Sequence, residues 1–328
     1  MTMLDLSTIG LQILLPLSLI AWLAFHPIRG RLGFVVQVAA TAAALAALLL
    51  GTVWMNPPWW TPYVYLALFA LAVVWRLPAA VRSDRWIPQS WSGRIGLILL
   101  GGFGLWSATL IMEARQGRHP PAKAKVLDLS FPMGPGVYLI ASGGATGLVN
   151  GHFLTLNPKT ERQRAYRGQS FGVDLIKIDA WGLSSAGWRP ADPANYAIFG
   201  EPVYAPCDGD VLRAGDGMAD MRVPDTDRSQ LEGNHVILQC GDVAVLLAHF
   251  RQNSVRVTAG DRVQTGARLG TAGNSGQSTE PHLHIHVQQI PAEGPLLSGE
   301  PVHLTFGGRF PVRNDRIVVD GQQRMQQR

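Results

Sequence analysis

The chain reads Pro281-His-Leu-His-Ile-His-Val287 where histidine alternates with aliphatic residues. Successive side chains of a β-strand point to opposite faces, so this period of two predicts a strand with three imidazoles on one face and apolar side chains on the other. Two histidines at this spacing can aim at one centre. The motif alone is weak evidence of a site, because three surface histidines would give the same pattern.

Short β-rich runs precede this strand and are separated by Gly, Pro, Asn and Asp. They include residues 136–140, 210–213, 235–240 and 242–248. None of them has helical periodicity, and turn residues bound each one. The sequence therefore predicts a mostly antiparallel β domain over residues 131–310, preceded by a linker at 115–130 and followed by a polar tail at 311–328.

The first third of the chain is apolar enough to enter a membrane. Four stretches approach the roughly 20 apolar residues that are needed to cross a bilayer. They cover residues 6–25, 32–55, 59–75 and 95–112. None contains Asp, Glu, Lys, Arg or His, which argues against a transport site. We expect a membrane domain over residues 1–114, with four transmembrane α-helices that anchor the rest of the chain.

Arginines lie in the links after the first and third stretches, whereas the link between the second and third stretches has no charge. The two basic links hold Arg29, Arg31, Arg76, Arg82, Arg85 and Arg94. Basic links stay in the cytoplasm, so the part of the chain after Met112 is expected on the other side of the membrane.

Composition and charge exclude several classes of protein. The chain is 47% hydrophobic and has two cysteines, which rules out a disordered chain and a disulfide scaffold. Of its 28 basic and 23 acidic residues, six Arg and two Asp precede Glu113, so the remainder holds 22 basic and 21 acidic residues. A nearly neutral part with no basic run argues against nucleic acid as a partner.

Several motifs precede the histidine-rich strand in a fixed order. They are Gly200-Glu-Pro-Val-Tyr-Ala-Pro-Cys-Asp-Gly-Asp-Val211, Gly233-Asn-His-Val-Ile237, Leu247-Ala-His249, and glycines at 260, 266, 270, 273 and 276. The ordered set, over about Gly168 to Gln288, resembles the lysostaphin-like (LytM-domain) zinc metallopeptidases, which cut peptide cross-links of bacterial peptidoglycan. The resemblance implies a domain of that type and does not extend to the membrane part.

The resemblance also implies roles for individual residues. Asp174 and His284 match the family's metal-binding Asp and His, and His249 and His282 match its two catalytic histidines. This agrees with zinc chemistry, since Zn²⁺ takes nitrogen and oxygen ligands and keeps one position open for water. The metal activates the water and polarises the scissile carbonyl, while neighbouring imidazoles move the proton and bind the oxyanion.

Two positions depart from the family pattern. Ser170 stands where the family has its first metal-binding His, and His286 stands where an acidic residue often follows the final motif. A hydroxyl is a poor zinc ligand, so a donor must come from elsewhere. We expect His152, in a turn-like Asn-Gly context, to be the third metal ligand. His286 is the less favoured candidate because a third alternate residue on one strand would point past the site. His235 is expected to be an exposed strand residue.

Two functions from different classes fit these residues. The first is a membrane-anchored zinc metalloendopeptidase that hydrolyses peptidoglycan cross-links, and retention of both His249 and His282 favours it. The alternative is a catalytically degenerate domain that binds peptidoglycan or activates a cell-wall amidase, which the Ser170 departure favours. Either one implies a multi-pass protein of the bacterial inner (plasma) membrane with its C-terminal domain periplasmic or extracellular. The sequence names no protein partner.

The two cysteines lie at the ends of neighbouring predicted strands. An antiparallel pairing with Ala214 opposite Gly233 places Cys207 opposite Cys240, within disulfide range. An oxidising compartment would let the bond persist. The alternative is a pair of buried free thiols.

Overall fold

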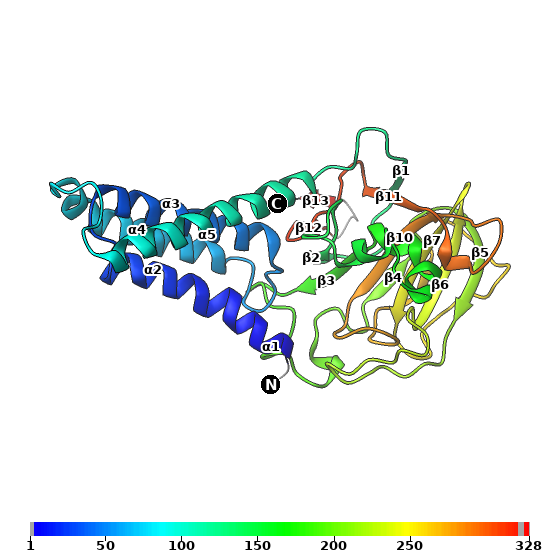
Figure 1. Ribbon diagram of the computed structural model, residues 1–328. Helices are drawn as coiled ribbons and strands as arrows, with labels where there is room; N and C mark the ends of the chain where they lie inside the picture. Colours follow the sequence, from blue (N-terminus) through cyan, green and yellow to red (C-terminus); the bar gives the residue numbers. More distant parts are fainter. Residues whose placement is uncertain (1–2, 321–324, 328) are drawn as a thin grey trace. The chain divides into compact units, whose positions relative to one another are not determined.

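The structure is a computed structural model that describes residues 3–320 and 325–327, with side chains described for residues 6–320. The chain divides into two compact units, Met1–Arg115 and Gln116–Arg328. The first is helical and the second is built on β-strands (Figure 1).

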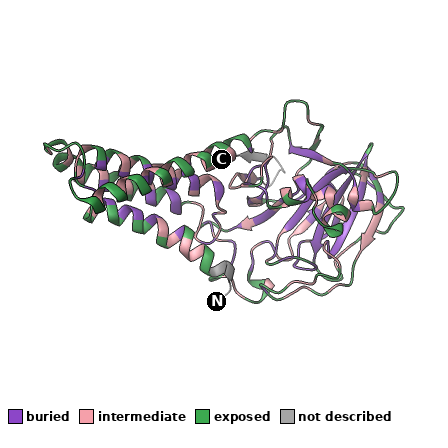
Figure 2. Ribbon diagram, viewed as in Figure 1, coloured by how far each residue is buried: buried purple, intermediate pink, exposed green. Residues whose placement is uncertain are grey.

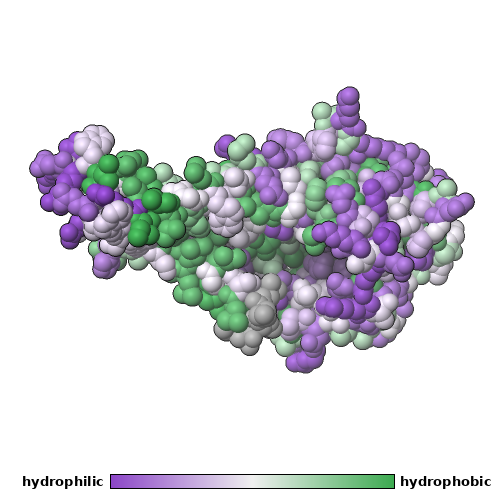
Figure 3. Space-filling model, in the orientation of Figure 1, coloured by the Kyte–Doolittle hydropathy of each residue, from purple (hydrophilic) through white to green (hydrophobic). Residues whose placement is uncertain are grey.

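The helical unit contains four segments long and apolar enough to cross a membrane, as the sequence predicts. Its elements are α1 (Met3–Thr8), a π-helical segment η1 (Ile9–Leu14), α2 (Leu15–Phe25), α3 (Arg31–Gly51), α4 (Thr61–Val81) and α5 (Trp91–Gln116). Much of the helical surface is exposed although it is hydrophobic (Figures 2 and 3). Trp75 and Leu105, for example, are more than 70% exposed. Such a surface is typical of helices whose surroundings are lipid.

Two helices extend beyond the predicted spans. Helix α4 continues from Trp75 to Val81 and therefore includes Arg76, and α5 begins at Trp91 and includes Arg94. Both arginines lie outside the predicted stretches 59–75 and 95–112, which hold no ionisable residue, but inside the longer helices. Hydropathy falls at an arginine, but a helix continues wherever its backbone hydrogen bonds continue, and a long arginine side chain can reach the membrane surface.

The second unit is organised around one large sheet. Its strands are β1 (Val126–Leu129), β2 (Gly136–Ser142), β3 (Val173–Ile178), β4 (Pro202–Tyr204), β5 (Gly209–Gly215), β6 (Asn234–Cys240), β7 (Val243–Phe250), β8 (Arg262–Val263), β9 (Arg268–Thr271), β10 (Leu283–Gln289), β11 (Pro301–Phe306), β12 (Arg316–Val319) and β13 (Met325–Gln327). The main order is β13-β12-β2-β3-β10-β7-β6-β5-β8, with β1 on β11 and β11 on β10, and β4 pairs with β9 separately. All pairs are antiparallel except β1 with β11. The predicted mostly antiparallel domain is confirmed.

Strand β10 lies in the middle of this sheet, between β3 and β7. Every residue of β7 is buried, which explains why its sequence is an apolar run rather than an alternation. Leu283, Ile285 and Val287 of β10 point into the main core on one face of the sheet. The opposite face of β10 is thus left to its histidines, as the alternation predicts.

The β unit is larger than the sequence indicates. Strand β1 lies within the expected linker and pairs with β11, and β12 lies within the expected tail and pairs with β2. Arg313, also in the expected tail, donates to the carbonyl oxygens of Ala141 and Leu148. The linker and tail boundaries at 130 and 311 are therefore wrong for these segments, because strands of only four residues give too little alternation to be recognised.

Cys207 and Cys240 form a disulfide with their Cα atoms 6.0 Å apart. The predicted pair is confirmed, and the alternative of free thiols is wrong. The predicted register is also wrong, because Ala214 pairs with Val236 rather than with Gly233. A bulge between Val211 and Arg213 shifts the register, and Cys207 reaches Cys240 from the segment that precedes β5.

Candidate metal centre

Three neighbouring strands bring the predicted site residues together. Asp174 on β3 lies directly opposite His284 on β10, which lies opposite Ala248 on β7. His249 follows Ala248 near the end of β7, and His282 immediately precedes β10. Residues that are 110 positions apart in the sequence thus meet at one end of three paired strands. The antiparallel register alone places Asp174, His249 and His284 side by side.

His152 reaches the same point from outside the sheet. It lies in the 3₁₀ helix η2 (Gly151–Thr155), whose N-cap residue Asn150 is fully buried. The Asn150 amide donates to the carbonyl oxygens of Gly144 and Gly172, and its oxygen accepts from the His152 backbone. Asn150 therefore ties the η2 turn to the segment that leads into Asp174. An Asn-Gly pair in the sequence indicates a turn but does not indicate this role.

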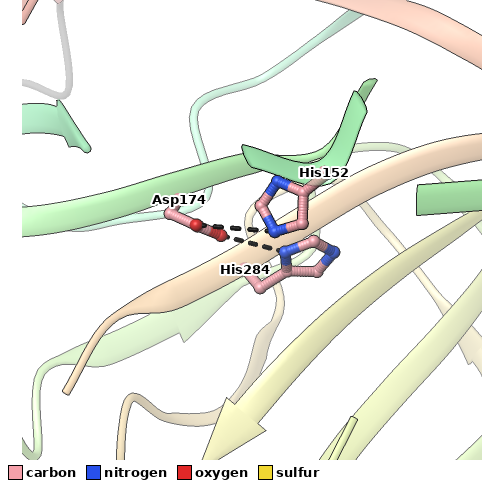
Figure 4. Close-up of side chains that lie close together, drawn as sticks. All are labelled: His152, Asp174 and His284. Carbon is pink, nitrogen blue, oxygen red and sulfur yellow. Dashed lines mark hydrogen bonds and ion pairs between the residues drawn. The ribbon is translucent and has the colours of Figure 1, made fainter. Parts of the chain in front are cut away.

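His152, Asp174 and His284 form a group that could hold a metal ion. One ligand atom from each residue lies within 4.8 Å of the others. The His284 Nδ1 atom lies 2.9 Å from Asp174 Oδ1, and the His152 Nε2 atom lies 3.5 Å from Asp174 Oδ2 (Figure 4). The donor set of two imidazoles and one carboxylate is one that zinc accepts in catalytic sites.

Hydrogen bonds fix which nitrogen each imidazole presents. The Nδ1 atom of His152 lies 3.1 Å from Asn150 Oδ1. The Nδ1 atom of His249 lies 2.9 Å from the Ser275 carbonyl oxygen, and that of His282 lies 2.9 Å from the Glu280 carbonyl oxygen. Since these partners are acceptors, each Nδ1 carries the proton and each Nε2 keeps a lone pair. His152 can therefore bind a metal through Nε2, and His249 and His282 can accept a proton there.

The environment sets the charge of the site. Burial lowers the pKa of His152 to about 4 and lowers the pKa of His249 well below its ordinary value. Burial alone would raise the pKa of Asp174, but the imidazoles of His152 and His282 and the hydrogen bond from His284 hold it below its usual range. Near pH 7 Asp174 is thus a carboxylate and His152 is neutral, which are the protonation states that a metal ligand needs.

His249 has a backbone conformation that a residue with a side chain rarely adopts, with φ at +65°. Two hydrogen bonds hold it there, from the His249 amide to the Glu232 carbonyl and from the Gly273 amide to the His249 carbonyl. Such strain is found at functional sites, where the surrounding structure overrides it.

Ser170 does not contribute a ligand. Its side chain is fully buried, lies 2.9 Å from the Thr155 hydroxyl and donates to the Arg167 carbonyl oxygen. Gly172 lies between Ser170 and Asp174, and a Cβ atom there would come within 2.6 Å of the His284 ring. The segment before Asp174 therefore packs against the His284 ring, whereas the His152 imidazole comes from η2.

The site opens into a groove of about 510 Å³. Its walls include Tyr166 and Glu232, and the Tyr166 hydroxyl donates to the Glu232 carboxylate at 3.0 Å. Arg213 pairs with the other Glu232 oxygen and donates to His235 Nε2. The expectation that His235 is exposed is wrong. It is 1% exposed, because β6 lies between β5 and β7 and the Arg213 and Gly215 residues of β5 pack against the ring.

His286 lies closer to the site than the sequence indicates. Its Nδ1 atom is 2.9 Å from His284 Nε2, and both rings are buried. The expectation that it points past the site is wrong, although it is not one of the three grouped donors. If His284 binds a metal through Nδ1, its Nε2 carries a proton that His286 Nδ1 accepts. Such a partner fixes the tautomer and the orientation of a metal-binding imidazole.

A substitution can test this positioning role. His286→Phe keeps an aromatic ring and removes the acceptor, so we expect zinc affinity to fall by roughly 10- to 100-fold. His286→Gln retains an acceptor oxygen and should lose much less. Competition with a chromophoric chelator at pH 7 measures both affinities. Equal zinc affinity in the Phe variant and the unsubstituted protein would remove His286 from the metal centre.

A buried histidine behind the site predicts how stability depends on pH. His303 stacks on Phe171 with 3.7 Å between ring centroids, and burial lowers its pKa to about 4. Between pH 6.5 and 4 the unfolded chain gains a proton that the folded chain excludes. The contribution of His303 to the free energy of unfolding is therefore fully present above pH 6.5. It is lost as the pH falls toward 4, and the loss amounts to about 3 kcal/mol.

His303→Phe should remove this part of the acid destabilisation. Urea unfolding of a fragment of residues 116–328 at a series of pH values gives the free energy of unfolding. The slope of that free energy against pH is then compared between the variant and the parent. His119→Phe, at an exposed residue, is the matched control. Identical slopes in the His303 variant and the parent would contradict the prediction.

Comparison with known proteins agrees with this geometry. Residues 194–302, which include His249, His282 and His284, match the model for peptidase family M23. The chain carries an M23 peptidase domain. The match begins after His152 and Asp174 and therefore gives no information about those two residues.

Individual relatives match parts of the chain. A peptidoglycan DD-endopeptidase of Vibrio cholerae, ShyA, is 30% identical over 111 residues, which are 34% of this chain and 22% of that protein. The catalytic domain of lysostaphin from Staphylococcus simulans is 20% identical, with 51% of this chain and 84% of that chain covered and a TM-score of 0.25. A zinc-containing peptidase from Vibrio cholerae is 18% identical, with coverage of 53% and 39% and a TM-score of 0.28.

Proposed function

We propose that this protein is a membrane-anchored zinc metalloendopeptidase that hydrolyses peptide cross-links of bacterial peptidoglycan. The observation that carries the proposal is the position of His152, which completes a three-residue donor set with Asp174 and His284 although the family's first metal-binding His is replaced by Ser170. The M23 domain and the resemblance to a peptidoglycan endopeptidase support the substrate class.

The residues fit the chemistry of a zinc peptidase. His152, Asp174 and His284 would hold the ion, which when bound supplies an acidified water and polarises the scissile carbonyl. The rings of His249 and His282 lie 4.6 Å apart, and both line the groove. One imidazole can take the proton of the water at Nε2 and return it to the leaving amine. An imidazole that has taken up a proton at Nε2 can also donate a hydrogen bond from there to the developing oxyanion.

The proposal can be tested with the β unit and isolated peptidoglycan. A fragment of residues 116–328 is incubated with cross-linked peptidoglycan, with added zinc and with a chelator. We expect release of uncross-linked muropeptides that the chelator stops and zinc restores. Binding to peptidoglycan without release, at full zinc occupancy, would replace this proposal with the non-catalytic alternative.

We further propose that the helical unit spans the bacterial plasma membrane four times and places the M23 domain in the periplasm or outside the cell. The apolar helices and the arginines of the links after α2 and α4 support this topology. A reporter that is active only outside the cytoplasm, fused after Arg328, should be active. Activity of a cytoplasm-only reporter at the same position would overturn the topology. The M23 domain would then lie in the cytoplasm, where it could not reach peptidoglycan.

A further inference from the structure

A basic cavity of about 440 Å³ lies within the helical unit, at the end where α2 gives way to α3 and where α4 ends. Four arginines line it, Arg29, Arg76, Arg82 and Arg85, against a single carboxylate, Asp84. Its other walls include apolar side chains such as those of Phe34 and Ala80. This end of the unit is hydrophilic beside a hydrophobic helical surface (Figure 3).

The arginines at this end fall into two groups. Arg31 donates to the carbonyl oxygens of Ser83 and Val81 and lies over the Trp86 ring, and Arg94 donates to the Pro88 carbonyl oxygen. Among the described residues, the four cavity arginines have no side-chain hydrogen bond or ion pair. The Nε atom of Arg76 is buried and has no partner. A buried guanidinium donor without an acceptor is costly, so Arg76 is suited to an anion. The side chains of Arg29, Arg82 and Arg85 are exposed and line the same cavity, where they add positive charge.

The protein itself holds the walls of the cavity in place. The first turn of α3 bonds to the loop after α4, through the Arg31 amide to the Arg85 carbonyl oxygen and the Leu32 amide to the Trp86 carbonyl oxygen. Gly30 has φ at +95°, and a Cβ atom there would come within 3.0 Å of the Trp86 carbonyl oxygen. The arginines are therefore carried on two segments that are bonded to each other before any ligand binds.

The surroundings indicate an amphiphilic anion. Helix α4 contributes Arg76 to the cavity and exposes Val74, Leu77 and Val81 on the same turns. A phosphate can take several guanidinium hydrogen bonds in forked geometry, and acyl chains can cover the neighbouring apolar side chains. A free anion would leave that apolar surface uncovered.

We propose that this cavity binds the phosphate headgroup of an anionic phospholipid, on the cytoplasmic side of the membrane. The inference rests on the proposed membrane insertion of the helices and does not depend on the peptidase activity. It assigns a specific ligand to the cavity arginines. A general attraction between basic links and an anionic membrane would instead involve Arg31 and Arg94 as much as the cavity arginines.

Native mass spectrometry of the full chain in neutral detergent tests the proposal. The protein is titrated with phosphatidylglycerol, with phosphatidylcholine and with inorganic phosphate. We expect phosphatidylglycerol to bind and phosphatidylcholine to bind at least tenfold more weakly. Each lost arginine should weaken phosphatidylglycerol binding roughly fivefold, so Arg76→Gln should show that loss and the Arg82→Gln/Arg85→Gln pair a loss of about 25-fold.

Arg115→Gln is the matched control, because it removes the same charge at the other end of α5. It should leave phosphatidylglycerol binding unchanged. If Arg76→Gln does not yield folded protein, the pair of exposed loop substitutions decides the matter. Equal binding by the loop pair and the Arg115 variant, or equal binding of the two lipids, would overturn the proposal. Displacement of phosphatidylglycerol by inorganic phosphate at equal concentration would overturn the lipid as the ligand. Muropeptide release by the same preparations reports separately on the peptidase proposal.

Discussion

His152→Ala will abolish zinc binding as completely as His284→Ala. Catalytic zinc needs three protein donors in addition to water, and Asp174 with His284 provides only two. The third donor, the His152 imidazole, is held by the buried Asn150 side chain, so its Nε2 atom is directed toward the Asp174 carboxylate before a metal binds. Removal of either imidazole leaves a two-ligand site, and zinc should then be lost on dialysis in both variants.

Ser170→Ala is the matched control for this experiment. Its hydroxyl bonds only to Thr155 and to the Arg167 carbonyl oxygen, so we expect zinc content to remain near that of the unsubstituted protein. Atomic emission analysis of the dialysed proteins gives the stoichiometry, and circular dichroism checks that each variant is folded. Full zinc content in the His152 variant would contradict the assignment of His152 as the third ligand and would make His286 the next candidate.

The part of the site that lies on strands could be predicted from the sequence. The alternation in residues 281–287 indicates a strand with imidazoles on one face, and the structure places His284 and His286 on that face with His282 just before it. The motif spacing points to Asp174, which the sheet register places opposite His284. These predictions hold because a strand's period of two and its pairing are properties of the backbone.

The contacts that depend on side-chain packing could not be predicted. Nothing in the sequence shows that Asn150 ties η2 to Gly172, since an Asn-Gly pair only indicates a turn. The burial of His235 follows from the position of β6 inside the sheet, which its own sequence does not give. The register of β5 with β6 depends on a bulge near Leu212, and one inserted residue moves every pair beyond it.

We assign His282 to catalysis rather than to metal binding, and this assignment predicts a large loss of peptidase activity when the residue is replaced. Its Nε2 atom lies 3.5 Å from Asp174 Oδ1, the same separation as between His152 Nε2 and Asp174 Oδ2. Distance to the carboxylate therefore does not separate the two histidines. Position does, because His282 lies beside His249 in the groove, whereas His152 joins Asp174 and His284 in the ligand group.

His282→Ala should therefore keep its zinc and lose activity, by about 10²- to 10⁴-fold, which is the usual contribution of a general acid–base residue. His249→Ala should behave in the same way, and the double variant should lose little more than either single one, because the two imidazoles are proposed to act on the same transition state. His119→Ala, outside the groove, should retain full activity. Muropeptide release and zinc content are measured on the same samples, since loss of both from the His282 variant would make that residue a ligand and leave His152 without the role proposed for it.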